Sequence, residues 1–195
     1  MAVGWPLPTP KAPATSGIPA GSSALAWEMT VRNDRTGYGD ILVDDGKEYG
    51  SASRLQAVMN MGPLGQYPAD TSGKVGGRGQ VTGDTPLTIL AHEAGHLFLA
   101  YVSVRDPENA AALPMLNNVN FAHWSFYFNS DASYLEGNRI RDDGSGVSPR
   151  FRTTATVQSF SELDQYLMGF RSSWMRNGAI FLQPRWLMHN LLSRS

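Results

Sequence analysis

The chain has no cysteine among its 195 residues. This absence excludes a disulfide scaffold, a thiol nucleophile, a zinc ribbon and an iron–sulfur centre. Imidazole and carboxylate side chains are then the ligands available to a protein-bound metal.

Long hydrophobic runs are also missing. The most apolar window, residues 97–104, is far shorter than the roughly 20 residues that cross a bilayer. The first residues show neither the early basic cluster nor the apolar segment of a secretory signal. We therefore expect no membrane span and leave localisation open, between a protein kept inside the cell and one secreted in a full-length form.

The chain has little net charge, but its charges are unevenly distributed. All 17 acidic residues lie between Glu28 and Asp164, and the 11 basic residues of that stretch leave it at −6. The last 25 residues contain four arginines and no acid. An acidic body lacks the basic face that nucleic-acid binding requires, so we expect no nucleic-acid partner.

The composition is sufficient for one folded domain. Hydrophobic residues make up 42% of the chain and aromatic residues 10%, which permits a real core. We expect an arm or linker rich in proline and glycine at residues 1–23, a domain at residues 24–170, and a basic, divergent tail at residues 171–195.

Local patterns indicate a mixture of strands and helices within the domain. Strands are expected at residues 24–31, 38–43 and 124–128, and helices at residues 51–59 and 162–168. Asp142, Asp143 and Gly144 predict a turn. The glycine-rich residues 72–79 include a lysine but lack a P-loop pattern, so a surface loop is favoured.

The best-defined element is a long helix that carries His92, Glu93 and His96. It is expected to begin at Asp84 or Thr85 and to end near residue 104. Residues four apart share a helix face, so both imidazoles can reach one Zn²⁺ ion. Glu93 is placed to take a proton from a zinc-activated water as a general base. The competing interpretation is a buried helix whose histidines are satisfied by hydrogen bonds.

A catalytic zinc site of this kind needs a third protein ligand. Asp164 is a carboxylate candidate, although Ser161, three residues earlier, also fits it to a helix cap. Asp131 is assigned to a turn. His123, which directly precedes the aromatic strand, is favoured over Asp164, but both remain open. His189, in the tail, receives little weight.

Several runs resemble the zincin superfamily of zinc metallopeptidases, and in particular a group of poorly characterised bacterial zincin-like proteins. The likeness covers roughly residues 24–170. It rests on five runs: LTILAHEAGH at residues 87–96, HWSF at 123–126, DAS at 131–133, EGN at 136–138 and LDQYLMG at 163–169. The tail does not resemble the proline-rich continuation expected in such proteins.

Two zincin subclasses help to place the third ligand. In metzincins a glycine and a histidine would stand where this chain has Leu99 and Val102, so that subclass is excluded. In gluzincins a glutamate arrives from a later helix. Glu162 lies on such a helix, but Ser159 three residues before it makes a capping box the favoured interpretation.

The resemblance implies an α+β fold in which a mixed β-sheet packs on the active-site helix and its edge strand aligns an extended peptide. The implied function is zinc-dependent hydrolysis of peptide bonds in a peptide or protein substrate. Tyr166 or Tyr134 is a candidate for stabilising the oxyanion, on residue type alone. The alternative is an inactive or truncated zincin-fold module that binds metal or peptide without turnover.

Overall fold

The structure is a computed structural model that describes residues 25–34, 42–76, 83–98, 103–106, 109–115 and 122–171. The predicted arm at residues 1–23 lies outside the described residues. So does His189, together with nearly all of the predicted tail.

The described elements form an α+β fold, as predicted. The strands pair into four two-stranded antiparallel sheets, β1 with β4, β2 with β3, β5 with β6, and β7 with β8. The single mixed sheet expected from the sequence is therefore not seen among the described strands. In chain order the elements are β1 (Trp27–Thr30), β2 (Arg32–Asn33), β3 (Val43–Asp44), β4 (Ala57–Asn60), the 3₁₀ helix η1 (Leu64–Gln66), α2 (Pro86–His96), β5 (Ser103–Asp106), β6 (Asn109–Pro114), β7 (Asn138–Asp142), β8 (Phe151–Thr156) and α3 (Glu162–Leu167).

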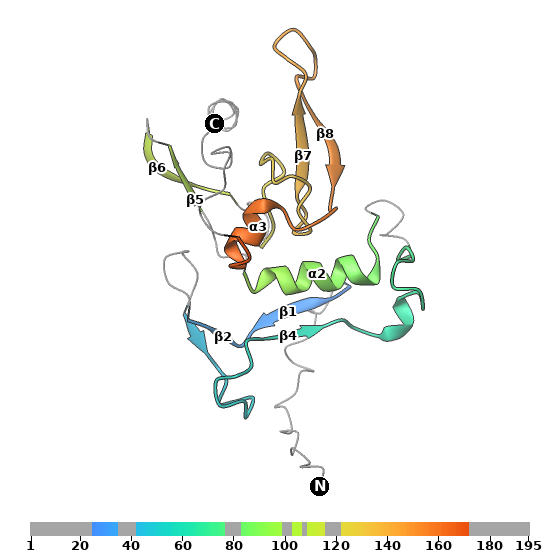
Figure 1. Cartoon of the computed structure of the whole chain (residues 1–195), viewed down its shortest axis with the longest axis vertical. Coiled ribbons are helices and arrows are strands. Elements are labelled where there is room, and N and C mark those ends of the chain that lie inside the picture. The colour runs from blue at the N-terminus through green and yellow to red at the C-terminus, as the bar shows by residue number, and fades with distance from the viewer. Residues whose placement is uncertain are drawn as a thin grey trace.

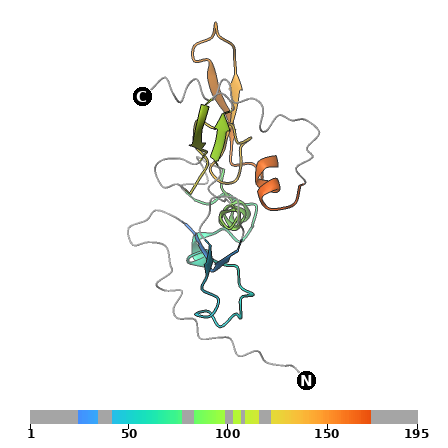
Figure 2. The same cartoon turned by 90° about the vertical axis from the view of Figure 1, so that its left-hand side faces the viewer.

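Helix α2 occupies the middle of the molecule. The β1–β4 pair lies along one side of it, and α3 with the β7–β8 hairpin lies on the other (Figures 1 and 2). Each side has its own apolar cluster. The first contains Ala26, Val75 and Ile89, and the second Met115, Trp124, Leu135, Leu163 and Leu167. None of the helices in the described part of the chain has the length and apolar character needed to cross a membrane.

Helix α2 begins where the sequence predicted and ends earlier. The Thr85 side chain caps the backbone N–H of Thr88, and Pro86 takes the first position, where its missing N–H costs nothing. The helix ends at His96, whereas the prediction continued it to residue 104. Residues 103–106 form strand β5, because they pair antiparallel with β6. The apolar periodicity that predicted a longer helix continues into this strand.

The helix predicted at residues 51–59 is wrong, because residues 57–60 form strand β4. Val58 lies opposite Met29 of β1, so pairing with a distant strand overrides the local helical spacing. Ala52 and Ser53 have φ angles of 47° and 61°, left-handed values that are incompatible with an α-helix there.

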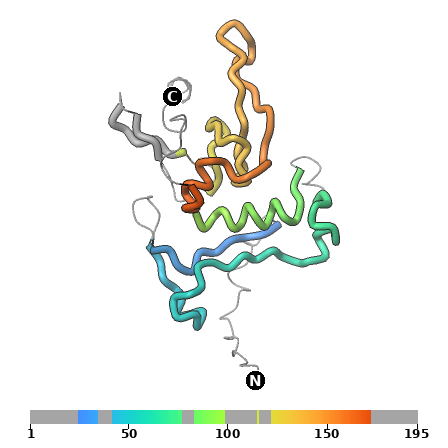
Figure 3. The backbone as a smooth tube through the Cα atoms, viewed as in Figure 1, coloured from blue at the N-terminus to red at the C-terminus, as the bar shows by residue number. Residues whose placement is uncertain are grey.

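The aromatic segment at residues 124–128 is a turn and not the predicted buried strand. Trp124 is fully buried, but Phe126 and Tyr127 are exposed. The segment therefore contacts the core at its two ends, through Trp124 and through Phe128, whose ring packs against that of Trp124. The tube in Figure 3 shows how the chain winds tightly after this point before entering the β7–β8 hairpin.

The remaining predictions are confirmed in part. The strand expected at residues 24–31 is the shorter β1, and of residues 38–43 only Val43 belongs to a strand, while residues 35–41 lie outside the described residues. Asp142, the first residue of the turn predicted at residues 142–144, is the last residue of β7, and residues 143–150 connect β7 to β8. The sequence did not predict these two strands. Helix α3 was predicted at residues 162–168, one residue longer than the observed helix. Part of the glycine-rich loop, residues 77–79, is not described.

Candidate metal centre

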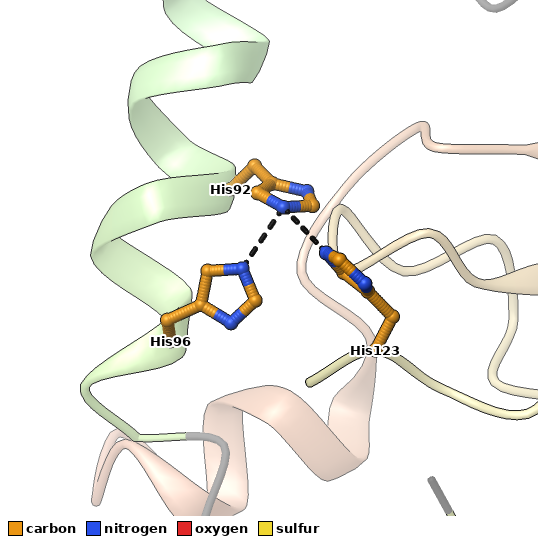
Figure 4. Close-up of side chains that lie close together, drawn as sticks. All are labelled: His92, His96 and His123. Carbon is orange, nitrogen blue, oxygen red and sulfur yellow. Dashed lines mark hydrogen bonds between the residues drawn. The ribbon is translucent and has the colours of Figure 1, made fainter. Parts of the chain in front are cut away.

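Three histidines converge beside the last turns of α2 (Figure 4). The Nε2 atom of His92 lies 3.0 Å from Nε2 of His96 and 3.0 Å from Nε2 of His123. Each ring offers one nitrogen as a ligand, and these three nitrogens all lie within 4.8 Å of one another. The helix supplies the first two rings, and His123 arrives from 31 residues beyond His92.

The orientation of His92 is set by a backbone carbonyl. Its Nδ1 lies 2.7 Å from the carbonyl oxygen of Tyr134, and because that oxygen can only accept, Nδ1–H is the donor. A neutral imidazole with its proton on Nδ1 presents a lone pair at Nε2. The lone pair of His92 therefore points to the place where the other two rings meet.

Hydrogen bonding alone satisfies this arrangement poorly. The lone pair at Nε2 of His92 lies in the plane of its ring and can accept one well-directed hydrogen bond, yet two ring nitrogens approach it equally closely. Nitrogen ligands on one tetrahedral Zn²⁺, with bonds of roughly 2.0–2.1 Å, would stand about 3.3 Å apart. The donor set and its spacing fit a single metal ion.

His96 is held in the form that a metal requires. Burial lowers the pKa of His96 well below its ordinary value of 6.5, and the neighbouring His92 and His123 lower it further. His96 is therefore neutral at pH 7, and one of its ring nitrogens carries a lone pair that can bind a metal.

His123 is anchored through the residue that follows it. The indole Nε1–H of Trp124 lies 3.0 Å from Oδ1 of Asp164 and 3.1 Å from Oγ of Ser133. The backbone N–H of Trp124 donates to the carbonyl of Leu135 at 3.1 Å. Buried polar groups that are fully paired in this way hold the backbone at His123 in one place.

Asp164, the other candidate for third ligand, has a different set of partners. Its Oδ2 accepts the backbone N–H of Ser161 at 2.7 Å and completes a capping box at the start of α3, while Oδ1 accepts the indole of Trp124. Burial raises the pKa of Asp164 above its ordinary value, against the lowering effect of these hydrogen bonds. The structure groups His123, and not Asp164, with the two helix histidines.

Gly95 lets the helix and the opposite segment come together. A Cβ atom at this position would lie 2.9 Å from Cδ2 of Leu135, which is 2% exposed. Leu135 follows Tyr134, whose carbonyl binds His92. The glycine between the two motif histidines therefore permits the close approach that brings this carbonyl to the ring.

Glu93 is buried on α2, with 6% of its surface exposed. Its charge acts on the phenol of Tyr67. Burial raises the pKa of Tyr67 above its ordinary value, and Glu93 raises it further. The Tyr67 hydroxyl donates to the carbonyl of Met61 at 2.7 Å. Glu93 therefore lies toward the β1–β4 side of the helix, in a water-poor setting that strengthens its electrostatic effect.

The other predicted residues have structural contacts. Tyr166 packs against the cluster around Trp124, and the Tyr134 ring stacks edge-on against Phe160. Glu162 pairs with Arg171 at 2.9 Å on the surface, and the cap of α3 is Ser161, not Ser159. Asp131 lies in a turn, as predicted, with a φ of 54°.

Sequence reasoning missed two groups that touch the histidines. One is the carbonyl of Tyr134, and a backbone atom leaves no signal in the sequence. The other is Glu136, whose Oε2 lies 3.7 Å from Nδ1 of His123. The run EGN at residues 136–138 contributed to the resemblance, but nothing in its spacing connected it to a histidine.

Comparison with known proteins adds no information about this site. Searches of protein-family models, of curated proteins and of solved structures each found no match.

Proposed function

We propose that this protein is a zinc-dependent metallopeptidase with a zincin-like arrangement, acting on a peptide or protein substrate. The observation that carries the proposal is the convergence of three imidazoles, two of them from one helix turn that also bears Glu93. Three histidines that leave one position open are a known ligand set for catalytic zinc.

His92, His96 and His123 would hold the ion. Bound zinc would lower the pKa of a water and polarise the carbonyl of the scissile peptide. The carboxylate of Glu93 accepts a proton as the water oxygen bonds to the carbonyl carbon, and delivers that proton to the leaving nitrogen as the C–N bond breaks. The burial of Glu93 limits the access of bulk water to its carboxylate.

A zincin-like module that binds metal or peptide without turnover is the second candidate. The observation that favours it is the same burial of Glu93, because a general base must reach a water. Zinc bound at about one ion per chain, with no cleavage of any member of a peptide library, would select this function.

The test is to measure zinc content and casein hydrolysis for protein purified without a histidine tag, alongside Glu93→Gln. We expect about one zinc per chain in both proteins. We expect Glu93→Gln to hydrolyse casein at least about 100-fold more slowly than wild type, because a general base typically contributes 10²–10⁴-fold to the rate. Glu162→Gln, at an exposed glutamate, is the matched control and should hydrolyse normally. Equal hydrolysis by Glu93→Gln and wild type would refute the mechanism.

A further inference from the structure

One short stretch of chain reaches two of the three histidines on the side away from their converging nitrogens. We call residues 130–137 the outer segment. Its Tyr134 carbonyl accepts from Nδ1 of His92 at 2.7 Å, and its Glu136 carboxylate lies 3.7 Å from Nδ1 of His123. The two contacts are two residues apart in the chain and act on equivalent ring atoms.

The outer segment is held firmly in place. Ala132 and Ser133 are fully buried, and Ser133 Oγ accepts both the Trp124 indole and the backbone N–H of Leu135. A Cβ at Gly137 would lie 2.7 Å from the backbone nitrogen of Ser133, so only glycine fits there. A segment packed in this way fixes the backbone from which the Glu136 side chain extends toward His123.

We propose that Glu136 is a positioning residue that keeps the proton of His123 on Nδ1 and so directs its Nε2 lone pair toward the metal. This inference rests on the metal site of the proposed function. A carboxylate can only accept, so it favours N–H at the ring nitrogen that it faces. Carboxylates that pair with the second nitrogen of a ligand histidine orient the ring and raise its basicity.

The consequence follows from the arrangement of the nitrogens. A metal held by the Nε2 atoms of His92 and His123, which lie 3.0 Å apart, requires the ring proton of each histidine to be on Nδ1, where the Tyr134 carbonyl and the Glu136 carboxylate face it. The side chains of His123 and Glu136 are 13% and 29% exposed, so solvent screens their interaction only in part. The outer segment therefore makes the site favour a bound cation over an empty state.

Two measurements test the role of Glu136. The first is zinc affinity by competition with a chromophoric chelator, comparing wild type with Glu136→Gln, which keeps the shape and removes the charge. We expect a 10–100-fold loss of affinity, the range found for outer ligand partners. Glu162→Gln is the control for loss of one negative charge and should bind zinc as wild type does.

The second measurement is the tautomer of His123 in the zinc-free protein, from long-range ¹H–¹⁵N spectra. We expect a larger fraction of the Nδ1–H form in wild type than in Glu136→Gln. Wild-type His123 in the Nε2–H form would overturn the proposal even if the variant failed to fold, and so would an unchanged zinc affinity in a folded variant. Failure of wild type to bind zinc would instead refute the proposed function.

Discussion

His123 and Asp164 are both tied to Trp124, the first through the backbone and the second through the indole N–H. Only His123 directs a ring nitrogen at the helix histidines, whereas both oxygens of Asp164 are occupied by hydrogen bonds. The difference between ligand and anchor therefore depends on the partners of each side chain and not on its residue type.

Substitution separates these two roles. We expect His123→Ala to weaken zinc binding by more than about 100-fold, beyond the effect of losing an outer partner. We expect Asp164→Asn to keep one zinc per chain but to lower the free energy of unfolding by about 1 kcal/mol, the typical worth of a helix cap. Zinc titration and urea unfolding of both variants are the measurements. Unaltered zinc binding in His123→Ala would show that the third ligand is assigned wrongly.

At the scale of elements, the contact between α2 and the outer segment decides whether the site can form. The contact is close because Gly95 has no side chain beside Leu135. An alanine in an ordinary exposed helix position would instead add stability of roughly 1 kcal/mol relative to glycine.

We therefore expect Gly95→Ala to lower the free energy of unfolding, because overpacking costs about 1–3 kcal/mol and exceeds the gain in helix propensity. It should also weaken zinc binding, since displacing Leu135 moves the Tyr134 carbonyl away from His92. Urea unfolding and zinc titration measure the two effects. Ala94→Gly, at a partly exposed neighbour, is the control and should lose stability without losing zinc affinity. A stabilised Gly95→Ala protein would contradict the close packing.

An element could be predicted from the sequence where interactions between neighbouring residues determine it. The start of α2 and the pairing of His92 with His96 follow from a cap and a four-residue spacing, and both were predicted from the sequence. The predictions failed at strand β4, which depends on pairing with the distant strand β1, and at the end of α2, where the chain goes on to form β5 and pairs with the neighbouring strand β6.

The candidate site divides in the same way. His123 was favoured for its residue type and its scarcity, but its position depends on tertiary hydrogen bonds that no local pattern encodes. In the turn that replaces the predicted aromatic strand, Phe128 packs against Trp124, and Glu136 has a left-handed φ of 57° that its residue type does not favour. The outer contacts therefore had to be learned from the structure.

At the scale of the whole molecule, the three histidines join parts that otherwise belong to different layers. Helix α2 contributes Ile89 to the cluster on the β1–β4 side, while His123 adjoins the cluster that contains Trp124. An ion held by all three rings would link the helix to the opposite layer, in the folded protein only.

We therefore expect zinc to stabilise the entire fold. Binding to the native state alone adds about 2.7 kcal/mol when free zinc is 100 times its Kd. The melting temperature should rise with zinc concentration and fall again on chelation, as followed by calorimetry. The doubly substituted His92→Ala, His96→Ala protein should show no zinc-dependent shift. A shift retained in that protein would mean that the metal binds elsewhere.

The position of the β5–β6 hairpin between the ligands has a consequence for protein engineering. Residues 97–122 leave the site at His96 and return to it at His123, and the hairpin stands to one side of the helix (Figure 1). Because the entropy of closing a loop grows slowly, at about 0.6 kcal/mol for each doubling of its length, this excursion is free to lengthen or shorten. Variants with a longer or shorter interval between His96 and His123 can thus be built that keep the same three histidines.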